Sequence, residues 1–299
     1  MVTPFGERGE LDVGAAITLA RHLAGNGSES LVLAGTTGES PVLSDEEKLE
    51  LWRGVAEAVS IPVIAGSTTN DTAHSVHMTR QAEQAGVAAV LAVTPYYNRP
   101  SQTGLTRHFS AVAEATELPV ILYDIPVRTG RKIAADTMIR LAREHRNVVA
   151  VKDASADPAG TARLMAEVPA GFEVYSGDDN LTLPLLSIGA VGVISVAAHW
   201  VGPELARMMD AFFAGDVAEA ARLNRELVHV VAFQSSDEAP NPMPAKAILR
   251  AMGLPVGECR LPHGPAPQWL EERAEAVLAD LEAWRRANDA TSSVHAKTA

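Results

Sequence analysis

Hydrophobic and polar positions alternate between two patterns along most of the chain. Short continuous apolar runs are separated by longer stretches in which apolar residues recur at the spacing of a helix. Continuous runs rich in β-branched residues are typical of strands that are buried on both faces of a parallel sheet. The runs predict strands at Ser30–Leu33, Pro62–Ala65, Ala88–Val93, Pro119–Tyr123, Val148–Lys152, Phe172–Tyr175 and Val191–Ser195, and the end of an eighth at Met1–Pro4.

The stretches between the runs predict amphipathic helices that alternate with the strands. Ser44 followed by Glu47 has the spacing of a capping box, and Pro158 suits the first turn of a helix. The predicted helices are Asp12–Ala24, Asp45–Val59, Thr72–Ala85, Gly104–Ala115, Ala135–Glu144, Pro158–Glu167, Asn180–Ile188 and Pro203–Ala214.

This alternation predicts an α/β fold, a (β/α)₈ TIM barrel over residues 1–215. An open, doubly wound sheet is the alternative, but Thr3–Gly6 is not the glycine-rich phosphate turn that usually follows its first strand. Beyond the barrel the pattern predicts a helical extension over residues 216–289, and the small, polar residues 290–299 predict a disordered tail. The helices expected in the extension are Val217–Phe233, Pro244–Met252 and Pro267–Arg286.

Composition indicates which classes of partner and which cellular location to expect. The chain of 299 residues has a formal net charge of -12, which argues against nucleic acid or an anionic membrane as a partner. Cys259 is the single cysteine, so an internal disulfide is excluded and a reducing compartment is favoured. We find neither a secretory leader nor an apolar run approaching the ~20 residues of a membrane span. A cytoplasmic location is therefore expected.

Candidate chemistry begins with Lys152, which ends the buried strand predicted at Val148–Lys152. A lysine in apolar surroundings has its charged form disfavoured, and a free amine is what a Schiff-base nucleophile needs. The alternative is a lysine that merely extends from a strand end into water. The remaining lysines are Lys48 on an exposed helix face, Lys132 in a loop, Lys246 in the extension and Lys297 in the tail.

Polar motifs follow several predicted strands at the carboxyl edge, where the reactive groups of a TIM barrel collect. All four tyrosines of the chain lie at the carboxyl ends of predicted strands, and hydroxyls of tyrosines and of Thr37 are suited to proton transfer. Glycines flank Thr36 and Thr37 and allow close backbone approach, so the amides of this turn can bind a carboxylate. The motifs are Gly35–Ser40, Thr94–Pro100, Tyr123–Gly130 and Tyr175–Asp179.

Other polar residues allow two interpretations each. Arg128 offers a planar guanidinium for a second carboxylate, or pairs with a nearby acid at the rim. His74 and His77 lie one helical turn apart, but a solvated helix face explains them better than a metal site that lacks a third ligand. Asp178 and Asp179 suggest either a cation site or the N-cap of a helix. No bound metal is expected.

The motifs that carry a family resemblance are Gly35–Ser40, Thr94–Pro100, Tyr123–Gly130, Val151–Ala154, Tyr175–Asp179 and Gly192–Val196. In these motifs the chain resembles the dihydrodipicolinate synthase / N-acetylneuraminate lyase family of pyruvate-dependent class I aldolases. The likeness runs from Val2 to about Leu261. It implies a Schiff base between Lys152 and pyruvate, with no cofactor. The roles that it implies for the other residues are proton transfer by Tyr123, Thr37 and Tyr97, binding of the pyruvate carboxylate by Thr36 and Thr37, and a lining formed by Gly177 and the Ile194 carbonyl.

The resemblance also implies a second substrate and an assembly. The loop Tyr96–Pro100 and Arg128 resemble the synthase branch of the family, which implies that Arg128 binds the carboxylate of L-aspartate-4-semialdehyde in lysine and diaminopimelate biosynthesis. In this family the residue matching Tyr97 reaches the site of a neighbouring subunit. This implies a homo-oligomer, a homotetramer built from tight dimers.

Some positions depart from the family pattern. Asp124 stands where asparagine is usual, and Val127 where a small residue is common. In members that lysine inhibits, a histidine and a glutamate occupy the positions of Lys48 and His74, although Asn70 and Tyr96 match here. Weak or absent inhibition by lysine is therefore expected.

Two other functions remain open from the sequence. The first is another pyruvate-dependent aldolase of the family, acting on a 2-keto-3-deoxy sugar acid or on N-acetylneuraminate. The second is a non-catalytic barrel that senses keto acids. Such a sensor is expected to have lost at least one of Lys152, Tyr123 and Thr37, and all are present.

Overall fold

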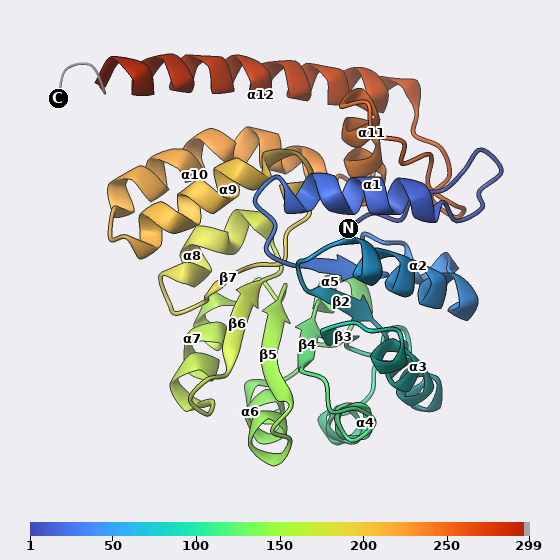
Figure 1. Ribbon diagram of the computed structural model, residues 1–299. Coiled ribbons are helices and arrows are strands. Elements are labelled where there is room, and N and C mark those ends of the chain that lie inside the picture. Colours follow the sequence, from blue (N-terminus) through green and yellow to red (C-terminus); the bar gives the residue numbers. More distant parts are fainter. Residues whose placement is uncertain (296–299) are drawn as a thin grey trace.

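The sheet at the centre of the molecule runs in strict sequence order (Figure 1). The structure is a computed structural model that describes residues 1–295. Each strand pairs in parallel with the next along the chain, and the sheet curls toward a barrel, which confirms the predicted α/β fold. The strands are β1 (Leu31–Leu33), β2 (Val63–Gly66), β3 (Ala89–Val93), β4 (Val120–Asp124), β5 (Val148–Asp153), β6 (Glu173–Ser176) and β7 (Gly192–Val193).

Met1–Pro4 does not form the eighth strand that the sequence predicts. The segment is buried beside β1, where the Met1 ammonium donates to the carbonyl oxygen of Val32 (2.7 Å). The next two residues pair with a side chain and a turn instead of continuing a strand ladder. The Val2 amide donates to Nε2 of His199 (3.1 Å), and the Thr3 hydroxyl donates to the carbonyl oxygen of Gly38 (2.6 Å). A segment this short that ends in a proline, which has no N–H, satisfies its polar groups in this way without a ladder.

Helices cover the outer face of the curled sheet (Figure 1). Ser44 and Glu47 form the predicted capping box before α2, because each side chain accepts a hydrogen bond from the other residue's amide (3.2 and 2.9 Å). The helices are α1 (Val13–Ala24), α2 (Asp45–Ala58), α3 (Thr72–Gln84), α4 (Gln102–Ala113), α6 (Ala135–Glu144), α7 (Pro158–Glu167), α8 (Thr182–Leu186) and α9 (Ala198–Phe213).

Two helices differ from the prediction. A short helix, α5 (Pro126–Thr129), follows β4 where the sequence indicates only a loop, and it carries Arg128. Helix α9 begins at Ala198 instead of Pro203, because Pro203 lies inside the helix just after a kink at Val201. Short 3₁₀ turns occur at Ser40–Val42, Asp179–Leu181 and Ala232–Gln234.

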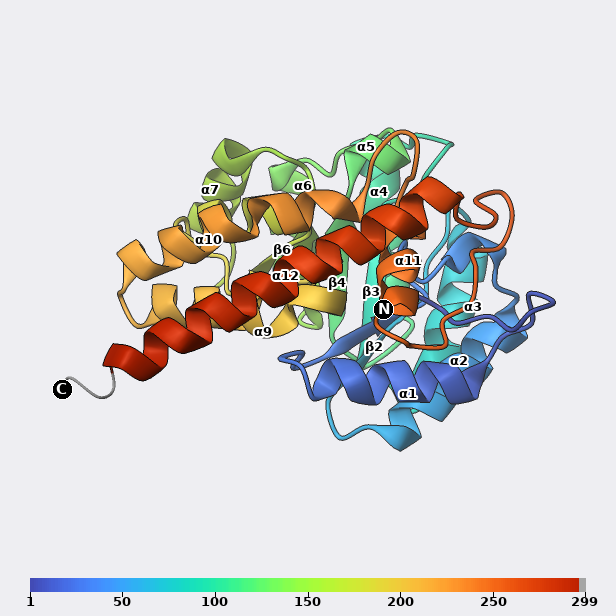
Figure 2. The same ribbon diagram turned by 90° about the horizontal axis from the view of Figure 1, so that it is seen from above.

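The C-terminal extension packs on the barrel helices instead of standing apart. Helix α10 (Val217–Val231) lies against α9, and α12 (Gln268–His295) crosses α11 (Met243–Ala251) as the outermost helix (Figure 2). Buried side chains of the barrel and of the extension belong to one hydrophobic core. Helix α12 includes residues 290–295, where the sequence predicts disorder, and residues 296–299 of that tail lie outside the described residues. Within residues 1–295, no helix combines the length and apolar character needed to cross a membrane.

A second, smaller apolar cluster fills the inside of the barrel. It includes Ile121 and Tyr123 of β4 and Ala150 of β5. Because side chains alternate between the two faces along a strand, Lys152 shares the inner face of β5 with Ala150. The strand register places Lys152 directly between Tyr123 of β4 and Tyr175 of β6. The fold therefore delivers the candidate nucleophile to the inside of the barrel.

Candidate active site

Lys152 lies almost buried at the carboxyl end of β5, with 9% of its surface exposed. Its Nζ is 4.5 Å from the centroid of the Tyr123 ring. Among the described residues, no carboxylate forms an ion pair with this lysine. The amine is therefore held against an aromatic ring in a largely apolar interior, as the Schiff-base interpretation requires.

The tyrosines do not all converge on this lysine. Tyr123 is buried beside it, whereas the Tyr175 hydroxyl donates to the carboxylate of Glu173 (2.6 Å), back toward the start of β6. Burial and this carboxylate raise the pKa of Tyr175. Tyr97 is 89% exposed and adopts a left-handed backbone conformation (φ 72°), which is unusual for a residue with a side chain. Of the four tyrosines that the sequence places at strand ends, only Tyr96 and Tyr123 line the cavity of the same chain.

The turn after β1 has the character of an anion-binding site. The amide of Glu39 donates to the carbonyl oxygen of Thr36 (3.1 Å), and that of Ser40 donates to Gly35 (3.2 Å), which closes the turn. Within residues 1–295, the amides of Thr36 and Thr37 donate to no protein acceptor. Successive unpaired N–H groups in a turn form a concave site for an anion. The amides of Thr36 and Thr37 are therefore free to bind a substrate carboxylate, as the sequence predicts.

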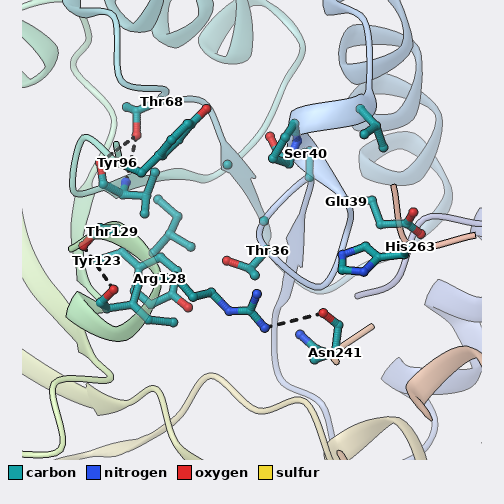
Figure 3. Close-up of a pocket in the computed structure, with 18 of the residues that line it drawn as sticks. Thr36, Glu39, Ser40, Thr68, Tyr96, Tyr123, Arg128, Thr129, Asn241 and His263 are labelled. Atoms are coloured by element: carbon teal, nitrogen blue, oxygen red, sulfur yellow. Dashed lines mark hydrogen bonds between the residues drawn. The ribbon is translucent and has the colours of Figure 1, made fainter. Parts of the chain in front are cut away.

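A cavity of about 290 Å³ opens beside this turn (Figure 3). Its lining is mostly apolar and includes Thr36, Tyr123 and Arg128 among the predicted residues. Lys152, Thr37, Gly177 and Ile194 are not part of that lining, and Tyr97 projects into solvent.

Gly177 and Ile194 lie at the same edge of the sheet as Lys152. The Gly177 amide donates to the carbonyl oxygen of Asp153 (2.7 Å), the neighbour of Lys152, and the Ile194 amide donates to Ser176 (2.8 Å). A side chain at position 177 would meet the backbone and Cβ of Ala154 within about 3 Å, so only glycine fits here. The segments after β5, β6 and β7 are thus fixed side by side.

Arg128 is presented to the cavity by α5. Its guanidinium extends toward Asn241 and lies 3.5 Å from the Asn241 carbonyl oxygen (Figure 3). Among the described residues, Arg128 forms no ion pair with a carboxylate. The alternative of a rim arginine neutralised by an acid is therefore not realised, and the guanidinium remains available for an anionic ligand.

Asn241 of the C-terminal extension completes this part of the site, and sequence reasoning missed it. Its side-chain Nδ2 donates to the Thr37 hydroxyl (3.0 Å), so one residue contacts both the Thr37 turn and Arg128. Pro262 and His263 of the extension also line the cavity. The only signal in the sequence is an Asn–Pro turn, which does not indicate which part of the barrel it contacts.

The acidic pair after β6 has a structural role. The Asp179 carboxylate accepts from the amides of Val196 (3.0 Å) and Ala197 (3.2 Å), and Asp178 caps the following turn through the Asn180 amide (2.9 Å). Burial raises the pKa of Asp179 although these bonds oppose the shift. The N-cap interpretation is therefore confirmed for Asp178, and Asp179 anchors the segment that follows Ile194.

Two lysines outside the site differ from the prediction. Lys48 is only 5% exposed instead of lying on an exposed helix face, because α3 packs beside α2. Lys246 of α11 is fully buried. Burial of a long polar side chain was not visible in the sequence, because it depends on neighbours far along the chain.

The chain is similar to known proteins over almost its whole length. The sequence pattern of the Dihydrodipicolinate synthetase family matches residues 1–282. The chain is 50% identical over 280 residues to 4-hydroxy-tetrahydrodipicolinate synthase of Moorella thermoacetica, covering 93% of this chain and 95% of that protein. A dihydrodipicolinate synthase structure from Bacillus anthracis has a TM-score of 0.90 at 43% identity, covering 93% of this chain and 95% of that one. The Acinetobacter baumannii enzyme, solved in complex with pyruvate, has a TM-score of 0.88 at 36% identity, covering 94% and 96%.

Proposed function

This chain belongs to the dihydrodipicolinate synthetase family, and we infer that it carries 4-hydroxy-tetrahydrodipicolinate synthase activity in lysine biosynthesis. The reaction condenses pyruvate with L-aspartate-4-semialdehyde. The observation that carries the assignment of chemistry is Lys152, held without an ion pair against the Tyr123 ring inside the barrel.

The first steps take place on Lys152. Its amine attacks the keto carbon of pyruvate, a C=N bond forms, and the keto oxygen leaves as water. The imine nitrogen then acts as an electron sink, so a methyl proton is lost and an enamine forms. The enamine carbon attacks the aldehyde carbon of the second substrate, and the aldehyde oxygen takes a proton. The amine of the second substrate then attacks the imine carbon, the bond from that carbon to Lys152 breaks, and the lysine amine is released. Tyr123 and Thr37 transfer protons in these steps.

Binding groups surround the reacting carbon. The free amides of Thr36 and Thr37 hold the pyruvate carboxylate, and Gly177 and the Ile194 carbonyl line the site. The unpaired guanidinium of Arg128 binds the carboxylate of L-aspartate-4-semialdehyde. The chemistry needs no metal or other cofactor, because the imine itself supplies the electron sink.

A second copy of the chain completes the proton relay. Tyr97 projects 89% exposed from a strained backbone, and strain of this kind persists where function or assembly maintains it. We infer that Tyr97 enters the cavity of a partner subunit in a homotetramer built from tight dimers. The single cysteine, Cys259, is in keeping with a cytoplasmic enzyme.

Trapping of the imine tests the chemistry directly. Borohydride reduction in the presence of pyruvate should attach the pyruvate carbon skeleton irreversibly to the peptide that contains Lys152, as read by mass spectrometry. Lys132→Met, which removes a partly exposed lysine paired with Asp157, is the matched control and should trap normally. Absence of an adduct in the wild-type protein would exclude every aldolase interpretation and favour the keto-acid sensor.

Arg128→Ala tests the second substrate. The variant should lose about 10²-fold in kcat/KM for L-aspartate-4-semialdehyde, because the guanidinium proposed to bind its carboxylate is removed, while pyruvate trapping is retained. If turnover with this aldehyde remained intact, the assignment of the acceptor would be wrong. Sugar acids, including N-acetylneuraminate, would then be tested as alternative substrates.

A further inference from the structure

A fully buried ion pair joins the carboxylate-binding turn to the C-terminal extension. Oε1 of Glu39 lies 2.7 Å from Nζ of Lys246, and both side chains are 1% exposed. Nζ also donates to the carbonyl oxygen of Glu258 (2.8 Å) and lies 4.2 Å from the centroid of the Phe5 ring. The other carboxylate oxygen of Glu39 accepts from the Arg260 amide (2.9 Å). The Glu39 carboxylate therefore joins the turn after β1 to two residues of the C-terminal extension.

Glu39 also determines the shape of the turn. It adopts a left-handed backbone conformation (φ 56°), which costs free energy and persists only when its surroundings hold it. In this conformation its amide donates to Thr36, and the following amide, of Ser40, donates to Gly35. These bonds leave the amides of Thr36 and Thr37 unpaired. Contacts that keep Glu39 in this backbone conformation therefore also keep the amides of Thr36 and Thr37 free to bind an anion.

The charge of Glu39 makes its partner important. Glu39 is part of the cavity lining, within three residues of the amides that bind the carboxylate of the 2-oxo acid. An uncompensated carboxylate in this dry environment would repel an anionic substrate strongly, because the interaction of charges rises as the dielectric constant falls. Lys246 cancels that charge from behind the turn, where it does not contact the cavity.

We propose that Lys246 and Glu39 are positioning residues for pyruvate: their ion pair fixes the turn around Thr36 and Thr37 and neutralises it, so affinity for the 2-oxo acid depends on α11. The inference rests on the proposed function. It gives the extension a role in substrate binding in addition to covering the barrel.

Kinetics with three variants test the proposal. Lys246→Met should raise the KM for pyruvate by about tenfold or more, with the KM for the aldehyde little changed, because the buried charge on Glu39 is left unpaired. Glu39→Gln combined with Lys246→Met removes both charges at nearly constant volume and should recover most of the pyruvate KM. Glu39→Gln alone should lie between the two. Lys132→Met, which breaks an exposed lysine pair, is the control and should leave pyruvate KM unchanged.

A melting temperature measured for each variant separates positioning from stability. A purely structural pair would lower the melting temperature and leave the pyruvate KM of the folded protein unchanged, and that result would overturn the proposal. Failure of the double variant to recover affinity would also overturn it. Borohydride trapping of pyruvate by the wild-type protein is the reference: if that fails, the proposed function is at fault and not the role of the pair.

Discussion

Lys152 and Lys246 are both almost completely removed from solvent, but their surroundings are opposite. Lys246 is enclosed by a carboxylate, a carbonyl oxygen and an aromatic ring. Lys152 has the aromatic ring of Tyr123 and no ion pair among the described residues. Burial lowers the pKa of Lys246, and the Glu39 carboxylate opposes that shift.

The difference shows that burial alone does not make a lysine a nucleophile. Nζ of Lys246 is enclosed by Glu39, the Glu258 carbonyl oxygen and the Phe5 ring, so a substrate carbonyl cannot reach it. Lys152 has no carboxylate partner among the described residues, so no ion pair holds its nitrogen away from a substrate carbonyl. In our proposals the two lysines have different roles: Lys152 reacts, and Lys246 maintains the turn that holds the substrate.

Removal of Lys152 should give the largest effect. Lys152→Ala should lower kcat by about 10³-fold or more, because the covalent route is lost. Borohydride trapping with pyruvate should be abolished in this variant and retained in Lys246→Met. Trapping on Lys246 would break the comparison, since it would mean that the paired lysine is reactive as well.

The stability of Lys246 variants should be the next largest effect. Lys246→Met should lower the free energy of unfolding by about 3–5 kcal/mol, because it leaves a buried carboxylate unpaired. The double variant with Glu39→Gln should recover most of that loss. Urea denaturation measures both values. Equal losses in the single and the double variant would contradict the pairing.

Asp124 is a buried carboxyl group that, like Lys152, forms no ion pair among the described residues. It is 1% exposed, it accepts from the Ile133 amide (3.0 Å), and its second oxygen has no partner. Burial raises the pKa of Asp124 to about 7, and nearby Asp153 adds to the shift. The folded protein therefore binds more protons than the unfolded chain between about pH 4 and pH 7, so stability should fall as pH rises through this window.

Asp124→Asn should remove that part of the pH dependence. Above pH 7 it should raise the free energy of unfolding by roughly 2–4 kcal/mol, because a buried charge is replaced by a neutral amide of similar shape. Near pH 4 the two proteins should be about equally stable. Urea titrations at both pH values measure the difference, and an equal gain at both would argue against titration of Asp124.

Lys48 extends the comparison to a third buried lysine, for which the smallest effect is expected. Burial lowers the pKa of Lys48. Close by, Nε2 of His74 lies 2.9 Å from the Asp45 carboxylate, so no glutamate is present there to bind the ammonium of an added lysine. Free L-lysine at millimolar concentration should change the rate less than ~2-fold, below the roughly 5–150-fold couplings of allosteric sites.

A matched variant sharpens this prediction. His74→Glu supplies a carboxylate that can accept from the ammonium of an added lysine, and it should increase the sensitivity of the rate to L-lysine. Steady-state rates with and without L-lysine measure the effect in both proteins. Strong inhibition of the wild-type protein would show that Lys48 and His74 do not exclude the ligand.

The sequence by itself determined the alternation of strands and helices and the position of Lys152 at the end of a buried strand. Both follow from local properties, because the spacing of apolar residues reflects the face that each element buries. The Thr36–Thr37 turn and Arg128 were found for the same reason, since motifs that follow parallel strands meet at one edge of the sheet. Two predictions were wrong at prolines. Met1–Pro4 does not form a strand, and α9 begins before Pro203, because a proline marks a break in regular structure but does not show what precedes it.

Only the tertiary structure decided which polar residues pair. Asn241 donates to Thr37 across 204 positions of the chain, and Lys246 reaches Glu39 from helix α11 of the C-terminal extension. No periodicity encodes such contacts, because they depend on how the C-terminal helices pack on the finished barrel. The lysine proposed to react was therefore visible in the sequence, whereas the ion pair of Lys246 with Glu39 was visible only in the fold.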